Sequence, residues 1–120
     1  MSVKDILIDA LETICPDDVY LQGSMNSEEA YPQKFITFFV SDTSDLEHLD
    51  DALVATQWDI SVIFYSNNPA EVNTIPAQIA TALKQAGFIQ QGKGFDILAD
   101  RPPFTGWAMD YIYRENETIN

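Results

Sequence analysis

The single histidine of this 120-residue chain lies in its most acidic stretch, segment 41–51. The acidic residues closest to His48 in sequence are Asp45, Glu47, Asp50 and Asp51. Imidazole and carboxylate groups together can bind a divalent metal ion. The spacing, however, fits neither two ligands on one helix face nor a calcium loop, which needs a glycine that is absent here. We therefore expect a solvated acidic loop between two strands, with no metal site.

A second candidate for chemistry is the set Gly87, Gly92 and Lys93, which has the glycine–glycine–lysine spacing of a phosphate-binding loop. Its context does not fit. Gly94 stands where that loop needs serine or threonine, and the order of helix and strand around it is reversed. A turn or a bulge, between or within strands, is expected instead.

No other pattern assembles a nucleophile, a base and an orienting group. The chain has one histidine and one cysteine, and no Gly-x-Ser-x-Gly, His-Glu-x-x-His or dinucleotide fingerprint. Cys15, at the end of an apolar helical stretch, is expected to be a small buried hydrophobe. The sequence predicts a protein that is not an enzyme and holds no cofactor.

The charge balance is the most unusual bulk property: 19 acidic and six basic residues give a net charge of −13. Such a surface repels phosphates, which argues against a nucleic-acid-binding module. Three interpretations remain open: solubility, an acidic wall along which DNA slides, or imitation of DNA to occupy a basic site. The lone cysteine and the lack of a signal or spanning segment indicate one cytosolic domain, residues 1–120, without membrane contact.

Hydrophobic periodicity then predicts the helices. Ser2, as N-cap, begins a helix that ends at Cys15-Pro16. A second apolar stripe with helical spacing follows residue 69 and stops at Gly87. Pro76 leaves two versions open: one helix from Pro69 that contains the proline, or a turn followed by a helix that starts near residue 75. We favour the second version.

Period-two patterns predict five strands. They are Val19–Gln22 at an edge, Lys34–Val40, an unusually long strand Leu53–Tyr65, Phe95–Ala99 and Trp107–Arg114. The strand at 34–40 is apolar on both faces, so either core packing or a neighbouring subunit covers its second face. Segment 23–31 is expected to be an exposed loop, and 115–120 a flexible tail. The fold is therefore predicted to be α+β: a mostly antiparallel four- to five-stranded sheet with two helices on one face, in the order α-β-β-β-α-β-β.

The order of these pieces resembles the tail-completion proteins of long-tailed bacteriophages, the tail terminator or head–tail joining group. The matching pieces cover most of the chain: the N-terminal helix, Tyr31–Phe39 with its acidic loop, Trp58–Ser66, the helix end Leu83–Phe88, Phe95–Asp100 and Gly106–Arg114. Relatives of this kind often carry Tyr-His before the last strand. This chain has Thr105-Gly106 there, so no role of that histidine transfers.

The resemblance implies a structural virion protein at the tail or neck, assembled in the host cytoplasm. Its copies would form a ring, typically a hexamer, that caps the tail tube and joins it to the head-side connector, while DNA passes through without specific binding. Candidate contacts with other subunits or the tube are Phe38, Asp45, Leu46, His48, Leu49, Leu53, Trp58, Phe104 and Trp107. Candidates for an acidic lumen are Asp42, Asp45, Glu47, Asp50 and Asp51. The alternative is an acidic DNA mimic that inhibits a basic DNA-binding protein, which suits the apolar strands less well.

Overall fold

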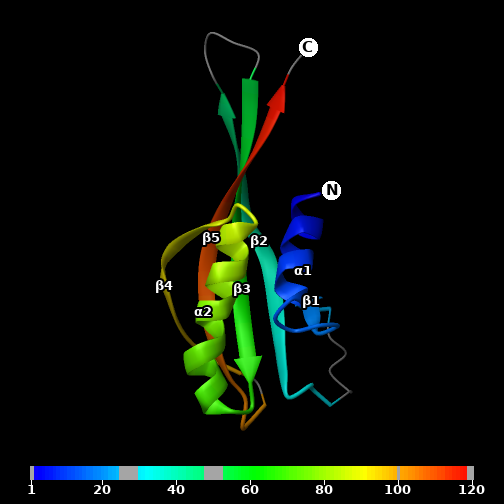
Figure 1. The fold of residues 1–120 in the computed structure, drawn as a ribbon, viewed down its shortest axis with the longest axis vertical. Helices are drawn as coiled ribbons and strands as arrows, with labels where there is room; N and C mark the ends of the chain where they lie inside the picture. Colours follow the sequence, from blue (N-terminus) through cyan, green and yellow to red (C-terminus); the bar gives the residue numbers. More distant parts are fainter. Residues whose placement is uncertain (1, 25–29, 48–52, 100, 119–120) are drawn as a thin grey trace.

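The fold is one five-stranded sheet with two helices, in a computed structural model that describes residues 2–24, 30–47, 53–99 and 101–118 (Figure 1). The elements are α1 (Val3–Glu12), β1 (Val19–Leu21), β2 (Lys34–Glu47), β3 (Leu53–Ser66), α2 (Pro69–Gln85), β4 (Ile89–Leu98) and β5 (Thr105–Thr118). The strand order is β1-β2-β3-β5-β4, in which β1 runs parallel to β2 and the other neighbours are antiparallel. The predicted fold class and element order are confirmed.

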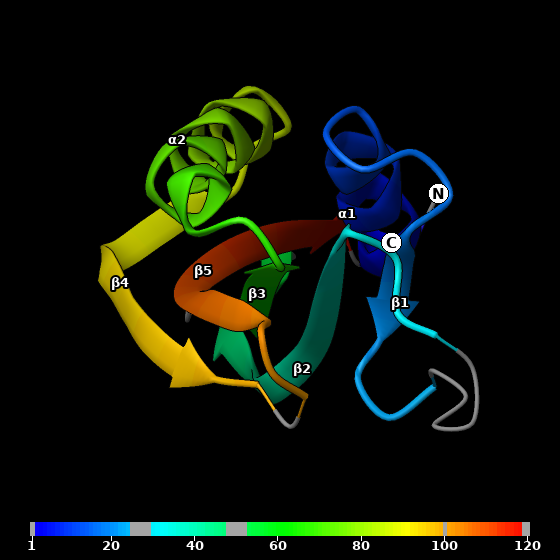
Figure 2. The ribbon, with the colours of Figure 1, turned by 90° about the horizontal axis from the view of Figure 1, so that it is seen from below.

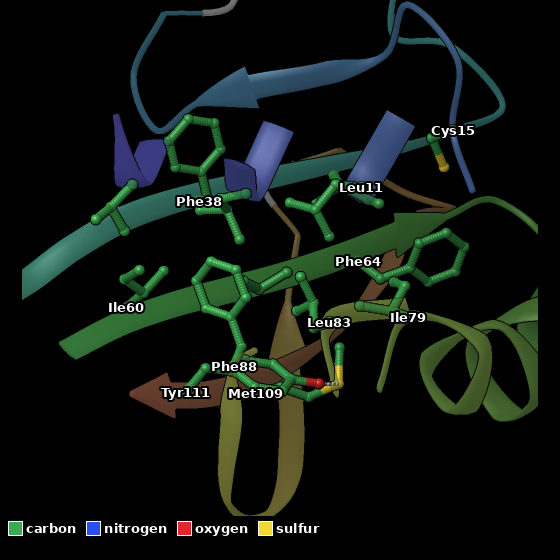
Figure 3. Close-up of a cluster of buried hydrophobic side chains, with 14 of the residues drawn as sticks. Leu11, Cys15, Phe38, Ile60, Phe64, Ile79, Leu83, Phe88, Met109 and Tyr111 are labelled. Carbon is green, nitrogen blue, oxygen red and sulfur yellow. Dashed lines mark hydrogen bonds between the residues drawn. The ribbon is translucent and has the colours of Figure 1, made fainter. Parts of the chain in front are cut away.

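Both helices lie on the same side of the curved sheet, as Figure 2 shows. Between them and the sheet is a core of buried apolar side chains from α1, α2, β2, β3 and β5 (Figure 3). Trp58, Ile60, Val62 and Phe64 recur at period two in the sequence, which predicts one fully buried face of their strand. Ile60, Val62 and Phe64 are at most 1% exposed on that face, whereas Trp58 is half-buried. We call the helix-covered side of the sheet the inner face and the other side the open face. Within the described residues, neither helix is long and apolar enough to span a membrane.

α1 begins as its sequence predicts. The Ser2 hydroxyl accepts a hydrogen bond from the Asp5 N–H (3.1 Å), and the Asp5 carboxylate accepts one from the Ser2 N–H (3.2 Å). The regular helix ends at Glu12 rather than at Cys15. The N–H groups of Ile14 and Cys15 both donate to the Leu11 carbonyl, which tightens the last turn ahead of the proline.

α2 is one continuous helix from Pro69 to Gln85 with Pro76 inside it, so the favoured start near residue 75 is wrong. Two interactions account for the longer helix: the Asn68 side chain caps its first turn, and Pro76 is buried in the same stripe as Ile79. Burial of the ring offsets the backbone hydrogen bond that proline cannot make. The helix stops at Gly87 (φ 99°) as predicted, with the Phe88 N–H bonded to the Leu83 carbonyl (2.9 Å).

Two strands run further than their polar sequences indicate. β2 continues through Glu47, so the first part of the segment predicted to be an acidic loop is strand; residues 48–52 lie outside the described residues. β5 continues to Thr118, so 115–118, expected in a flexible tail, are paired with β3. The reason is tertiary: β3 offers hydrogen-bonding edges on both sides along its whole length, and this pairing overrides local propensity.

These extensions form a three-stranded projection that stands clear of the helices (Figure 1) and contributes to the 54 Å length of the molecule. We call this projection the arm, made of residues 42–47, 53–59 and 112–118. It begins at a bulge between Val40 and Asp42. A bulge bends its strand and increases the local twist, which helps to direct the arm away from the body.

The core predicts a measurable difference between two positions of α2. Leu83 is fully buried, so Leu83→Ala is expected to lower the free energy of unfolding by about 2–5 kcal/mol through lost burial and a residual cavity. Gln78→Ala, at an exposed position of the same helix, is the control and should stay within about 0.5 kcal/mol of wild type. Urea unfolding measures both, and equal effects would contradict this core.

Candidate functional site

The residues predicted to contact other subunits do not form one surface. Phe38 is 3% exposed and belongs to the chain's own core, where it presents no surface to a neighbour. Trp58 and Trp107 are half-buried and pack against that core. Phe104 lies in the loop before β5, far from the arm. The predicted contacts are therefore spread along the molecule.

The remaining predicted contacts belong to the arm or to its undescribed tip. Asp45 is exposed on β2, and Leu46 and Leu53 are strand residues of β2 and β3. His48 and Leu49 lie outside the described residues.

The predicted lumen residues divide between the two faces of the arm. Asp42 lies opposite Asp59 and Asp45 lies opposite Thr56, an odd separation that places the two aspartates on opposite faces of β2. Glu47 is the last residue of β2, and Asp50 and Asp51 lie outside the described residues. Because the segment was expected to be a loop, the alternation of its carboxylates could not be foreseen.

Two carboxylates that the sequence analysis did not select, Asp59 and Asp110, join Asp42 on the open face. Asp42 and Asp59 are direct cross-strand partners, an arrangement that is unfavourable between like charges. A hydrogen bond that Gln57 Nε2 donates to Asp59 (3.1 Å) offsets part of this cost, and Asp110 accepts one from the Ser61 hydroxyl (2.8 Å). In the sequence, the period-two spacing of Asp59 and Ser61 indicates that these two polar residues share one face of the strand. In the described part of the chain, no three metal-binding side chains converge.

Aromatic side chains cover the other end of the open face. Phe35 stacks on Tyr65 and meets the edge of Tyr31, with ring centroids 5.0 Å apart in both pairs. Phe104 packs beside them, and the Arg101 guanidinium lies 4.1 Å from the Tyr31 ring centre. The chain's own loops therefore cover this part of the second apolar face of β2, the first of the two possibilities left open.

A groove runs between α2 and β4. It consists of two adjoining hollows of about 300 and 430 Å³ that share Ala80 and Gln90 in their walls. The other apolar residues lining it include Val72, Pro76, Phe88, Met109 and Tyr111. No acidic residue lines the described walls, but Lys84 and Lys93 do. We call this surface the α2–β4 groove.

The outer wall of the α2–β4 groove is the glycine–lysine segment that mimics a phosphate-binding loop. It is a bulge within β4, where the pairing with β5 shifts between Gln91 and Phe95, as the sequence predicted. The Trp107 indole N–H donates to the Lys93 carbonyl (3.2 Å) and fixes this bulge against β5. β4 is an edge strand on which Ile89 and Phe95 are 51% and 55% exposed. The groove therefore borders an open strand with apolar side chains.

The buried titratable groups show no catalytic arrangement. Cys15 is 2% exposed, and burial raises the pKa of its thiol to about 11. Burial likewise raises the pKa of Tyr111 to about 12, and its hydroxyl points at the Met109 sulfur (3.5 Å; Figure 3). Both groups therefore stay protonated at neutral pH, as structural core residues do.

Of three comparisons with known proteins, the one with solved structures finds a similar fold. No family model matches the chain, and no curated protein sequence does. The structure is similar to a chain in a solved structure described as the virion of a native gene transfer agent (GTA) particle, with a TM-score of 0.56. The similarity covers 94% of this chain and 93% of that one, at 12% sequence identity. At this identity, the similarity shows the fold.

Two glycines of the bulge provide a matched test of how tightly it closes on β5. A Cβ at Gly94 (φ 98°) would meet the Trp107 indole nitrogen and lie 2.6 Å from the Ala108 carbonyl oxygen. A Cβ at Gly92 (φ 73°) would meet open space. Gly92→Ala is expected to cost about 1 kcal/mol of backbone strain, and Gly94→Ala about 2 kcal/mol more. Thermal unfolding measures the difference; equal losses would contradict the close approach.

Cys15 predicts slow thiol chemistry in the folded protein. At pH 8, a thiol reagent should label the native chain far more slowly than the urea-unfolded chain, because the reactive thiolate is suppressed by burial. The pKa of the Cys15 thiol is higher in the folded chain than its unfolded value near 9.0, so the proton that the buried thiol retains stabilises the fold. This stabilisation is fully present below about pH 9 and is lost as the pH rises towards 11. Cys15→Ala provides the blank, and equal labelling rates would show an accessible thiol.

Proposed function

We propose that this chain is a structural virion protein, a tail terminator or head–tail joining protein. The observation that carries the proposal is the similarity in fold to a virion chain along nearly the full length of both chains. The resemblance in sequence order to tail-completion proteins points the same way. In this role the protein works by assembly and holds no cofactor.

Open strand edges support assembly. β1 pairs with β2 only at Ile36–Phe38, and β4 pairs with β5 only up to Ile112. Beyond these points, the outer edges of β2 and β5 in the described arm have no strand beside them. Unpaired strand edges are sites where another chain can add. We infer that copies of the chain form a ring, a hexamer by resemblance, which binds the tail tube protein on one side and the head-side connector on the other.

The acidic surface suits the passage of DNA. The open-face carboxylates Asp42, Asp59 and Asp110 share one face, and we assign the lumen to this face together with the predicted residues Asp50 and Asp51. Glu47, also predicted to line the lumen, has the register of Asp45 on the other face of β2. A lumen lined with carboxylates repels phosphates, so that DNA moves through it without specific binding.

The test is the mass of the protein in solution and its appearance beside tail tubes. Light scattering across concentration, with negative-stain images of the same sample, should show a ring of several copies, free or on the ends of tubes from the same virus. A monomer that never caps tubes would contradict the proposal. If that monomer bound a basic DNA-binding protein tightly and in a salt-sensitive way, the DNA-mimic alternative would replace it.

A further inference from the structure

We propose that neighbouring copies assemble head to tail, with the arm of one copy lying in the α2–β4 groove of the next. This inference rests on the proposed ring and names the two surfaces that build it. It follows from three observations: a groove with unpaired lysines, an arm with an excess of carboxylates, and a geometry that directs the outer part of the arm away from the groove of its own chain.

The groove is the receiving surface. Its exposed apolar lining includes Ile89 and Ala77, and the exposed Lys84 and Lys93 supply positive charge. Lys34–Glu71 is the one ion pair within the described residues, and neither groove lysine has a side-chain partner there. Two unpaired cations beside an apolar hollow, in a chain of net charge −13, favour an acidic partner with some apolar surface.

The arm has the complementary composition. Its acidic positions are Asp42, Asp45, Asp59, Glu47, Glu115 and Glu117, and its one basic residue is Arg114. Asp45 is exposed and lies on the inner face of the arm, the face that carries Trp58. The Trp58 indole N–H donates to the Glu115 carboxylate (3.3 Å), which holds that charge on the same face. Asp45 and Glu115 are therefore the arm charges that we pair with Lys84 and Lys93.

Within one molecule the two surfaces meet at the base of the arm, where Tyr113 packs against Phe88 of the groove wall with ring centroids 4.7 Å apart. The outer part of the arm continues β2, β3 and β5 away from the helices along the long axis (Figure 1), whereas the groove is lined by residues of α2, β4 and β5. Beyond Trp58, the stretch Leu53–Gln57 is roughly 16 Å long at about 3.3 Å per residue. This reach is comparable with the narrower dimensions of the molecule, 28 and 22 Å, so the arm can cross the groove of an adjacent copy.

Contact between two different surfaces repeats with the same rotation from copy to copy. Such a heterologous interface closes into a ring when the rotation divides a full turn. It leaves the open-face acids Asp42, Asp59 and Asp110 outside the contact, where they remain available to line the lumen. The inner face of the arm therefore contacts the neighbouring copy, and its open face lines the lumen.

The test is a charge exchange between two variants. The groove variant Lys84→Glu/Lys93→Glu has acidic side chains at the paired positions of both surfaces, and the arm variant Asp45→Lys/Glu115→Lys has lysines at the paired positions of both. Each variant alone should need a protein concentration about tenfold higher or more for half-assembly, because like charges meet at every interface. An equal mixture should assemble again into alternating rings, because both kinds of junction then join opposite charges.

Controls with charge reversals lie on α1, where Asp9→Lys/Glu12→Lys changes the net charge as the arm variant does and Lys4→Glu reverses one lysine where the groove variant reverses two. Lys4→Glu and Asp9→Lys/Glu12→Lys alter exposed residues and should assemble like wild type. Circular dichroism and thermal unfolding show that every variant is folded. Rings that form normally in either test variant, no recovery on mixing, or equal losses in the controls would overturn the head-to-tail contact and leave the ring itself standing. A wild-type chain that forms no ring, even on tail tubes, would overturn the contact and the proposed function together.

Discussion

The structure depends on β3, which is hydrogen-bonded on both sides along its entire length. Both partners begin at Ser66; β5 follows β3 to Leu53, and β2 follows it to Val54. In the body, the alternate residues Ile60, Val62 and Phe64 bury one side of this strand under the helices. In the arm, the same backbone ladder continues without a helix above it. One strand therefore connects the folded core rigidly to the surface that we assign to assembly.

This arrangement separates stability from interaction. The core between the helices and the inner face supplies the apolar burial, and the aromatic cluster around Phe35 covers one end of the open face. The floor of the α2–β4 groove and the base of the arm belong to this core, whereas the rim of the groove and the outer part of the arm carry exposed side chains, which are available to other molecules. Their charges differ in sign: carboxylates predominate on the arm, and the groove is flanked by Lys84 and Lys93.

Sequence periodicity predicted the elements that carry the core, because their patterns reflect burial. The Ser2 cap, the stripe that includes Ile79, and the stop at Gly87 are local signals that the structure confirms. The arm was only half foreseen. The sequence predicts Leu53–Tyr65 as a long strand. Its partners at 41–47 and 115–118 are polar, and their sequences predict a loop and a tail instead. Their strand conformation comes from backbone pairing with β3, which no local side-chain pattern records.

The candidate site was harder to predict for the same reason. The assignment of acids to one lumen could not anticipate that Asp42 and Asp45 lie on opposite faces, since that follows from strand register. The α2–β4 groove depends on the bulge at Gly92–Gly94, which the sequence indicated, and on the distance between α2 and β4, which it did not. Phe38, an aromatic residue on a strand that is apolar on both faces, was predicted to contact another subunit, but its side chain is buried in the core.

The long pairing of β3 also has a consequence for the order of folding. β2 and β3 are neighbours in sequence, but β5 reaches β3 only after α2 and β4 have been synthesised. Until then one edge of β3 is open along its length, the situation in which nascent sheets pair with the wrong chain. Charged residues on exposed strands oppose such pairing. Asp59 on β3, with Asp42 and Asp45 beside it on β2, supplies charge of this kind, which disfavours pairing with another chain until β5 has closed the sheet.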